Sequence, residues 1–247
     1  MFYITYYAKK HKKFITRKGQ YDKPDGTKGK SFTSKNDVPC LVYWDLDNDG
    51  WLDFYIGTGS PEFSSVIPNR MFRSIEGNQF EEVTSAGGFG HIQKGHGVGF
   101  ADLDNDGDQD IYAVLGGAYE GDEYPNICFE NPISSNNWIV LDLKGVDSNR
   151  SAIGSLLKIE LDNERKIYNP INTGGSFGAN SLQAEIGLGS CKSIKKLTIN
   201  WPNSKPQIFY NINVNKKYEI VEGQDELSEK KYLKLRMRDN KKISHHN

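Results

Sequence analysis

Short apolar and aromatic runs, separated by turns rich in glycine and aspartate, make up the first half of the chain. None of these runs is long enough for an ordinary helix, and their β-branched and aromatic content favours strands. The expected strands lie at Leu41–Trp44, Phe54–Ile56, Val98–Phe100 and Ile111–Leu115, with two more near Met71–Arg73 and Phe80–Val83. Because residues 38–224 show no long 3.6-residue periodicity, the sequence predicts an all-β fold.

The second half continues with strand-like runs at a spacing of about ten residues, which is typical of a β-sandwich. The turn at Asp162-Asn163 and the glycines from Gly174 to Gly189 separate them. The runs themselves are Trp138–Leu143, Ser155–Leu161, Lys166–Tyr168, Lys195–Trp201 and Lys217–Val221.

An internal repeat distinguishes the first half of the chain from the second. The segment Asp45–Asp53 recurs as Asp102–Asp110, 57 residues later, and Pro68-Asn69 recurs at the same offset as Pro125-Asn126. Two separate marks at one offset indicate a duplicated unit. Four short strands in such a unit suit one blade of a β-propeller, so the sequence predicts about two blades followed by the sandwich.

Each copy of the repeat contains an acidic loop of the pattern DxDxDGxxD. Its glycine permits a sharp bend, so that alternating carboxylates can converge, and the residue after the glycine can add its backbone carbonyl. Several hard oxygen donors suit Ca²⁺ better than Mg²⁺, which keeps its waters. The sequence therefore predicts two calcium sites. The first has Asp45, Asp47, Asp49, Trp51 and Asp53 as ligands, and the second has Asp102, Asp104, Asp106, Asp108 and Asp110.

Two other kinds of loop share this acidic character, an EF-hand and a turn that binds no metal. An EF-hand is excluded because it needs a glutamate at the twelfth loop position, where Ile56 and Ala113 stand, and helices where strands are expected. The other is an acidic turn that binds no metal. Four aspartates within nine residues repel one another without a cation, and two copies at a fixed spacing make that alternative weaker.

Charge is unevenly distributed along the 247 residues, although the net charge is only −1. The first 37 residues carry +7 and residues 225–247 carry +3, so the acidic charge lies between them. Neither end holds a nucleic-acid motif, and both are expected to be solvated tails. We expect a strand near Phe2–Tyr7 and a short helix from Asp225.

No stretch of 18 consecutive apolar residues is present, so no transmembrane segment is expected. The N-terminal apolar run precedes a lysine cluster, and a signal peptide has the reverse order. Cys40, Cys128 and Cys191 form no CxxC pair. Each is expected to be a small buried hydrophobe, with one disulfide left open.

Catalytic motifs are missing from the sequence. His91 and His96 are five residues apart rather than at the HExxH spacing, and no nucleophile elbow or phosphate-binding loop occurs. A pair of carboxylates for glycoside cleavage remains an alternative, because aspartates are abundant. The expectation is a non-enzymatic protein, and the alternative is a glycan-active enzyme or an accessory subunit of a carbohydrate-processing complex.

The motifs resemble two known families in succession. The acidic loops, with Asn69–Arg73 and Phe80–Thr84, resemble FG-GAP/VCBS repeats, the calcium-bearing blades of integrin-alpha-like β-propellers. The second half resembles the ASPIC/UnbV domain, as in the cartilage acidic protein family, despite Ile186 and Asn203-Ser204 at positions where that family differs. The matching marks there are Asn137-Trp138, Ser148–Arg150, Ile153-Gly154, Gly187–Gly189, Trp201-Pro202 and Glu222-Gly223.

The resemblance implies an extracellular or cell-surface location and a role in cell adhesion, through a protein or glycan partner that the sequence does not identify. It divides the chain into a basic segment (1–37), the repeats (38–136), the ASPIC/UnbV domain (137–224) and a charged tail (225–247). Because propellers close with about 4–8 blades, a longer chain or another subunit is expected to supply further blades.

Overall fold

The computed structural model describes residues 3–8, 13–18, 40–59, 67–117, 120–132, 135–174, 179–231 and 233–235. For the first two ranges and for Cys40 and Leu41, it describes the backbone alone. Every regular element in these ranges is a strand, which confirms the all-β prediction. At the N-terminus, β1 (Tyr3–Ala8) pairs with β2 (Lys13–Lys18) in an antiparallel hairpin, in agreement with the strand expected near Phe2–Tyr7.

The repeats form two separate antiparallel sheets. The first follows the order β3 (Cys40–Trp44), β4 (Asp53–Gly57), β5 (Arg70–Ile75) and β6 (Gln79–Glu82). The second follows β7 (Gly95–Ala101), β8 (Asp110–Leu115) and β9 (Ile127–Phe129). Each acidic loop joins the first two strands of its sheet, and the pairs Trp44↔Asp53 and Ala101↔Asp110 close the two loops in the same register. The structure thus repeats as the sequence does.

A hydrophobic core lies between the two sheets of the repeats. One face of the first sheet contributes Val42, Tyr55 and Met71, and the second sheet contributes Phe100 and Ile111, all at most 2% exposed. Burial alternates along β8 from Ile111, because successive side chains point to opposite faces of the sheet.

The second half is a sandwich of two four-stranded sheets. One follows the order β13 (Ala184–Gly189), β10 (Asn137–Lys144), β16 (Lys216–Val221) and β17 (Ser228–Lys230), with β10 and β16 parallel. The other follows β12 (Lys166–Pro170), β11 (Leu156–Leu161), β14 (Ser193–Asn200) and β15 (Gln207–Asn213). Leu141, Leu157, Ile159 and Leu197 fill the core between them. The predicted sandwich is confirmed.

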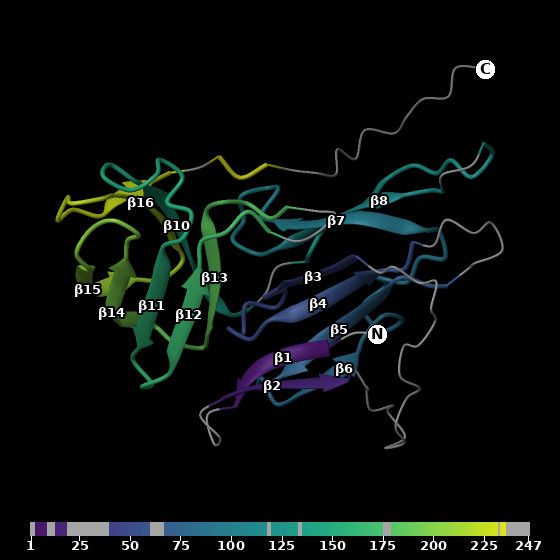
Figure 1. Ribbon diagram of the computed structural model, residues 1–247, viewed down its shortest axis with the longest axis horizontal. Coiled ribbons are helices and arrows are strands. Elements are labelled where there is room, and N and C mark those ends of the chain that lie inside the picture. Colours follow the sequence, from purple (N-terminus) through teal and green to yellow (C-terminus); the bar gives the residue numbers. More distant parts are fainter. Residues whose placement is uncertain are drawn as a thin grey trace.

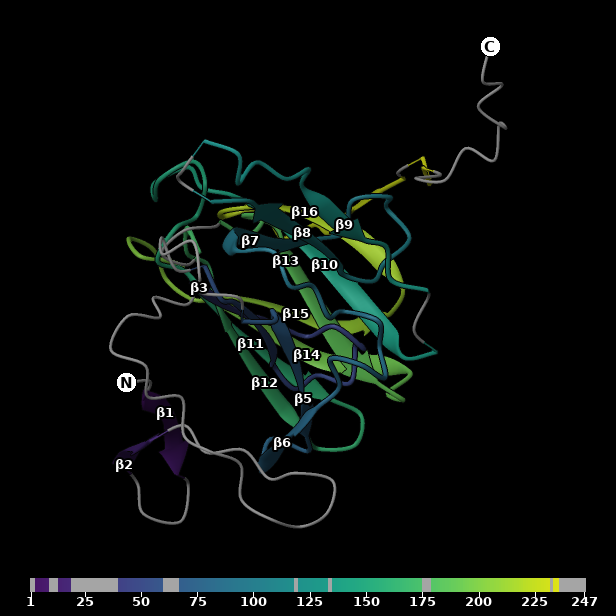
Figure 2. The same ribbon diagram turned by 90° about the vertical axis from the view of Figure 1, so that its right-hand side faces the viewer.

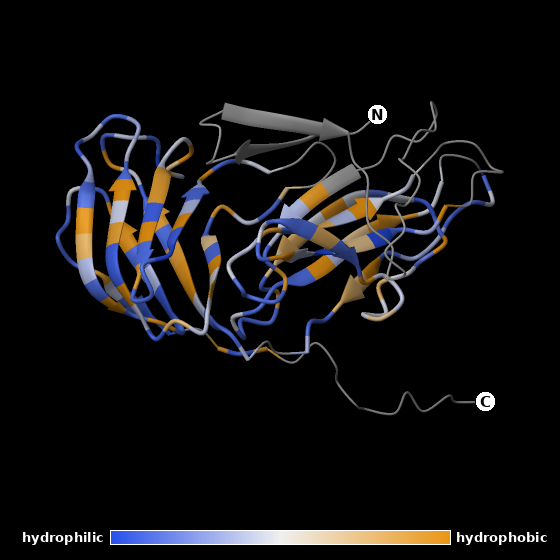
Figure 3. Ribbon diagram, turned by 90° about the horizontal axis from the view of Figure 1, so that it is seen from below, coloured by the Kyte–Doolittle hydropathy of each residue, from blue (hydrophilic) through white to orange (hydrophobic). Residues whose placement is uncertain are grey.

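The two halves lie side by side along the long axis of the molecule (Figure 1). The strands of the repeats stand in front of the sandwich strands when the molecule is viewed end-on (Figure 2). Hydrophobic and hydrophilic residues alternate along the sandwich strands (Figure 3). Strand β13 is an edge of its sheet and lies on the side that faces the repeats (Figure 1).

Two expectations from the sequence are corrected. Residues 228–230 form β17 rather than part of a helix from Asp225, because pairing with β16 and the Lys216–Glu229 and Lys230–Glu219 ion pairs outweigh a weak apolar face. Cys128, on the short edge strand β9, is exposed, whereas Cys191 is buried as expected. The side chain of Cys40, residues 19–39 and residues 236–247 lie outside the described part.

Candidate metal centre

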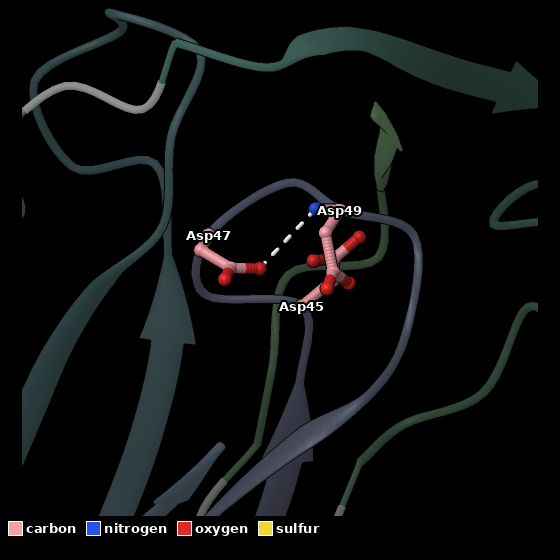
Figure 4. A group of neighbouring side chains, drawn as sticks. All are labelled: Asp45, Asp47 and Asp49. Carbon is pink, nitrogen blue, oxygen red and sulfur yellow. Dashed lines mark hydrogen bonds between the residues drawn. The ribbon is translucent and has the colours of Figure 1, made fainter. Parts of the chain in front are cut away.

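The first acidic loop brings three carboxylates together. One oxygen from each of Asp45, Asp47 and Asp49 lies within 4.8 Å of the other two (Figure 4). Left-handed backbone at Asn48 (φ 55°) and Gly50 (φ 83°) makes the tight turn that this convergence requires. The structure therefore places these three predicted ligands around one point.

Backbone amides of the same loop hold the carboxylates in place. The amide of Gly50 donates to Asp45 Oδ2 (2.7 Å), and the amide of Trp51 donates to Asp49 Oδ1 (2.8 Å). Among the described residues, Asp45 Oδ1 has no hydrogen-bond partner, although Asp45 is only 5% exposed. A buried carboxylate oxygen without a donor is costly unless a cation faces it.

The second loop repeats this arrangement with Asp102, Asp104 and Asp106, whose oxygens also lie within 4.8 Å of one another. The amides of Asp106 and Gly107 donate to the two oxygens of Asp102 (2.9 and 3.1 Å). Asp104 Oδ1 is buried and, within the described ranges, accepts no hydrogen bond. Both copies of the repeat therefore contain a buried oxygen that lacks a donor.

The fourth carboxylate of each loop lies outside these groups of three. Asp53 accepts hydrogen bonds from the amides of Leu46 (2.8 Å) and Ser74 (2.7 Å), and Asp110 accepts the equivalent pair from Leu103 and Asn131. These carboxylates tie the loop to the next strand or the segment after it. Whether they also contact a metal stays a prediction.

The residue after each loop glycine differs between the copies. Trp51 is 36% exposed, and the Arg165 guanidinium lies over its ring, 4.4 Å from the centroid. Asp108, at the equivalent position, is buried. Their backbone carbonyls remain predicted ligands.

Electrostatics in the loops favour a bound cation. Burial, with the charges of Asp53 and Asp49, raises the pKa of Asp45 well above its usual range. Burial, with the charges of Asp47 and Asp49, raises the pKa of Asp53 to about 7. Burial and the charges of Asp104 and Asp102 raise the pKa of Asp110 to about 6. Either protons or a metal ion can neutralise such groups.

The donor set fits a divalent cation. Each loop offers several carboxylate oxygens in a tight turn, and one of those oxygens is buried without a hydrogen bond. Hard oxygen ligands of this kind are those that Ca²⁺ takes in proteins. Both acidic groups can therefore hold a metal ion.

Positive side chains from elsewhere in the chain also approach the loops. Arg73 Nε lies 2.5 Å from Asp47 Oδ2, Arg165 Nη1 donates to the Asp49 carbonyl (2.6 Å), and Lys234 Nζ lies 3.0 Å from Asp106 Oδ2. The sequence interpretation missed all three. Arg73 lies within the Asn69–Arg73 motif, but nothing in that motif indicates a contact with Asp47. Arg165 and Lys234 lie in no motif.

A different kind of buried carboxylate occurs in the sandwich. Glu222 accepts hydrogen bonds from the Val146 amide (2.6 Å), the Ser148 amide (2.8 Å), the Ser148 hydroxyl (2.7 Å) and the Ser204 hydroxyl (2.5 Å). Burial would raise the pKa of Glu222, but the hydrogen bonds from Ser204, Ser148 and Val146 outweigh it and lower the pKa to about 2. This group is an anchor between loops.

Three residues that carry the family resemblance in the second half have structural roles. Trp201 is buried in the sandwich core, and the ring of Trp138 packs on Gly107 between the two halves. Asn149 closes a turn by exchanging two hydrogen bonds with the backbone of Ile153.

Two family models match parts of the chain, one in each half. A model of the FG-GAP-like repeat matches residues 45–113, and a model of the ASPIC and UnbV domain matches residues 145–227. No curated protein matches the chain. Across the described ranges, no helix has the length and apolar character that a membrane span needs.

Proposed function

We propose, because the chain combines an FG-GAP-like repeat with an ASPIC and UnbV domain, that it is a calcium-stabilised, non-enzymatic binding module. FG-GAP repeats are typical of extracellular proteins, and the proposed setting is the cell surface or the space outside the cell. The partner is a protein or a glycan. In this function the metal holds the repeats in shape and takes no part in chemistry.

The observation that carries the proposal is the unpartnered oxygen in each loop. Asp45 Oδ1 and Asp104 Oδ1 are buried and, among the described residues, accept no hydrogen bond, and each belongs to a carboxylate that converges with two others. Mg²⁺ fits less well because it retains several waters and takes fewer protein ligands. Calcium would supply the missing positive charge at both loops.

A non-enzymatic role agrees with the surroundings of the loops. The larger of two described cavities, about 310 Å³, lies beside Asp102 and Trp138, and four of its other eight lining residues are lysines. Its other acidic residue, Glu229, is paired with Lys216 at 2.5 Å. Among the described lining residues, this leaves no pair of acids outside the loop to act as acid and base, which weighs against the alternative of a glycan-active enzyme or accessory subunit.

The test of the proposal is a thermal melt of the whole protein in excess chelator and in millimolar Ca²⁺, with metal analysis of the purified protein. Each site should stabilise the folded state by about 2.7 kcal/mol at a hundredfold excess over its dissociation constant. Asp47→Ala and Asp104→Ala should each remove one site's share, and Mg²⁺ should substitute poorly.

Asp147→Ala is the matched control, because Asp147 is an exposed carboxylate on a sandwich loop. Its calcium response should equal that of the unmodified protein. An identical melting midpoint with and without calcium, together with no bound calcium in the intact protein, would refute the proposal. Screening a glycan array in calcium and in chelator then separates the glycan from the protein class of partner.

A further inference from the structure

Both acidic loops are covered at their glycines by side chains of the ASPIC and UnbV domain. A Cβ on Gly50 would lie 2.3 Å from Arg165 Nη2, and a Cβ on Gly107 would lie 2.0 Å from Trp138 Cε2. A side chain at Gly50 would require the Arg165 guanidinium to shift, and one at Gly107 would require the Trp138 ring to move. The two loops, 57 residues apart, therefore meet the same neighbouring domain through the same loop position.

The backbone of the second domain also lies very close to the first acidic loop. Gly187, in the edge strand β13, has no room for a side chain, since its Cβ would lie 2.1 Å from Asp45 Oδ2 and 2.4 Å from Asn48 Cα. One residue pair further along, the Gly189 amide donates to the Asn48 carbonyl (2.8 Å). Strand β13 thus forms one wall of the first acidic loop.

Arg165, just after the turn between β11 and β12, fixes the part of the first loop that carries Asp49. Its Nη1 donates to the Asp49 carbonyl (2.6 Å), and its guanidinium stacks on Trp51. The Trp51 amide in turn donates to the Asp49 carboxylate (2.8 Å). Arg165 therefore sets the backbone from which two predicted ligands project.

The segment that joins the two halves also binds the loop. Asn131 Nδ2 donates to the Leu46 carbonyl (2.7 Å), and Asn136 Nδ2 donates to the Asp47 carbonyl (2.8 Å). Together with Arg165 and β13, these groups bind backbone carbonyls at four positions of the first loop, from Leu46 to Asp49. The second domain thus binds two of these four carbonyls, and the joining segment binds the other two.

We propose that the ASPIC and UnbV domain is the built-in partner of the acidic loops, with Arg165 as a positioning residue of the first site, so that metal binding and domain docking stabilise each other. The inference rests on the proposed function, because it takes Ca²⁺ as the ligand of the loops. A docked domain orders the loop before the metal arrives, which lowers the entropic cost of binding. By thermodynamic reciprocity, calcium must then favour docking by the same factor.

The test uses the full chain in calcium and in chelator. Small-angle scattering measures the radius of gyration, limited proteolysis probes the segment between β9 and β10, and titration calorimetry measures calcium affinity at each site. The unmodified protein should be compact and resistant in calcium, and should expand and become cleavable in chelator. Gly187→Ala, which wedges β13 from the loop, should show the expanded, cleavable form even in calcium.

Arg165→Ala separates positioning from general stability. It should weaken calcium binding at one site by about tenfold and leave the other site unchanged, and Arg165→Lys should recover part of the loss. Gly90→Ala is the control for glycine replacement, because its nearest contact would be at 3.4 Å. A merely structural arginine would lower the melting midpoint in chelator without a site-specific change in affinity.

The outcomes distinguish the inference from the proposed function. If both sites bind calcium but the scattering and proteolysis profiles are the same in calcium and in chelator, docking is independent of the metal and the inference is wrong. Unchanged calcium affinity in Arg165→Ala would overturn the positioning role. Absence of any calcium-binding heat in the unmodified protein would refute the proposed function itself, and the inference with it.

Discussion

The acidic loops and Glu222 show two ways in which this protein buries carboxylates. In the loops, Asp45 and Asp104 each keep a buried oxygen that accepts no hydrogen bond among the described residues, and burial raises the pKa of both. Glu222 is equally inaccessible, at 5% exposure, but its four donors lower its pKa to about 2. The loop carboxylates each have an oxygen that lacks a donor, whereas Glu222 has four donors.

The difference teaches that burial of a carboxylate does not by itself indicate a metal site. The number of hydrogen-bond donors at each oxygen distinguishes a structural anchor from a metal ligand. Hydrogen bonds already stabilise the charged form of a fully bonded carboxylate, so it does not need a cation. Opposite responses to mutation and to pH should follow, and each response tests whether the comparison holds.

Removal of the Glu222 carboxylate should have the largest effect. Glu222→Ala leaves the amides of Val146 and Ser148 and two hydroxyls without their acceptor, and should lower the free energy of unfolding by about 3 kcal/mol. Urea unfolding in chelator measures the loss, and calcium should not reduce it. Glu222→Gln, which keeps one acceptor, should lose less. If calcium restored the free energy of unfolding of Glu222→Ala, the two regions would not differ as proposed.

Neutralising a loop carboxylate should act in the opposite direction. In chelator, Asp45→Asn removes one of the repelling charges, keeps an acceptor for the Gly50 amide, and should stabilise the protein by ~1 kcal/mol. In calcium the same variant should be less stable than the unmodified protein, because one site is lost. The change in melting midpoint caused by Asp45→Asn should therefore be positive in chelator and negative in calcium. Asp147→Asn, on an exposed sandwich loop, should change neither.

Stability should depend on pH in opposite senses in the two regions. The folded pKa of Glu222, about 2, lies below its usual 4.5, so its contribution is present above pH 4.5 and is lost as pH falls toward 2. The folded pKa values of Asp53 and Asp110, about 7 and about 6, lie above their usual 3.8. Their contribution is present below pH 3.8 and is lost as pH rises to 7.

Unfolding in chelator should therefore show stability that falls between pH 4 and pH 7, and calcium should remove that fall. Glu222→Gln should flatten the acid limb below pH 4.5 and leave the higher range unchanged. A calcium-free protein whose stability rises steadily from pH 4 to pH 7 would contradict the assignment of the loop carboxylates.

The smallest expected effect separates the two loops from each other. Arg73 pairs with Asp47 in the first loop, and Lys234 pairs with Asp106 in the second. Each cation competes with a metal for its carboxylate, so Arg73→Ala should raise the calcium affinity of the first site alone by about threefold, an effect that should shrink in high salt. Calorimetry at two ionic strengths measures it. Arg70→Ala, on the same strand and paired with Glu82, is the control.

The sequence predicted the parts of this molecule that are determined locally. The loops at Asp45–Asp53 and Asp102–Asp110, the strands around them and the change to a sandwich after the repeats all follow from spacing and residue type. It could not predict contacts between distant segments, such as Arg165 with the Asp49 carbonyl. The helix expected from Asp225 failed for the same reason, because pairing of Ser228–Lys230 with β16 is a tertiary effect.

The glycine at position 187 limits how far the two halves can be treated as interchangeable modules. Any other residue there would meet the Asp45 carboxylate and the backbone of Asn48. A chimaera that joins another sandwich to these repeats must therefore have a glycine at this point of its edge strand. The repeats thus restrict the sequence of any sandwich that can pack against them.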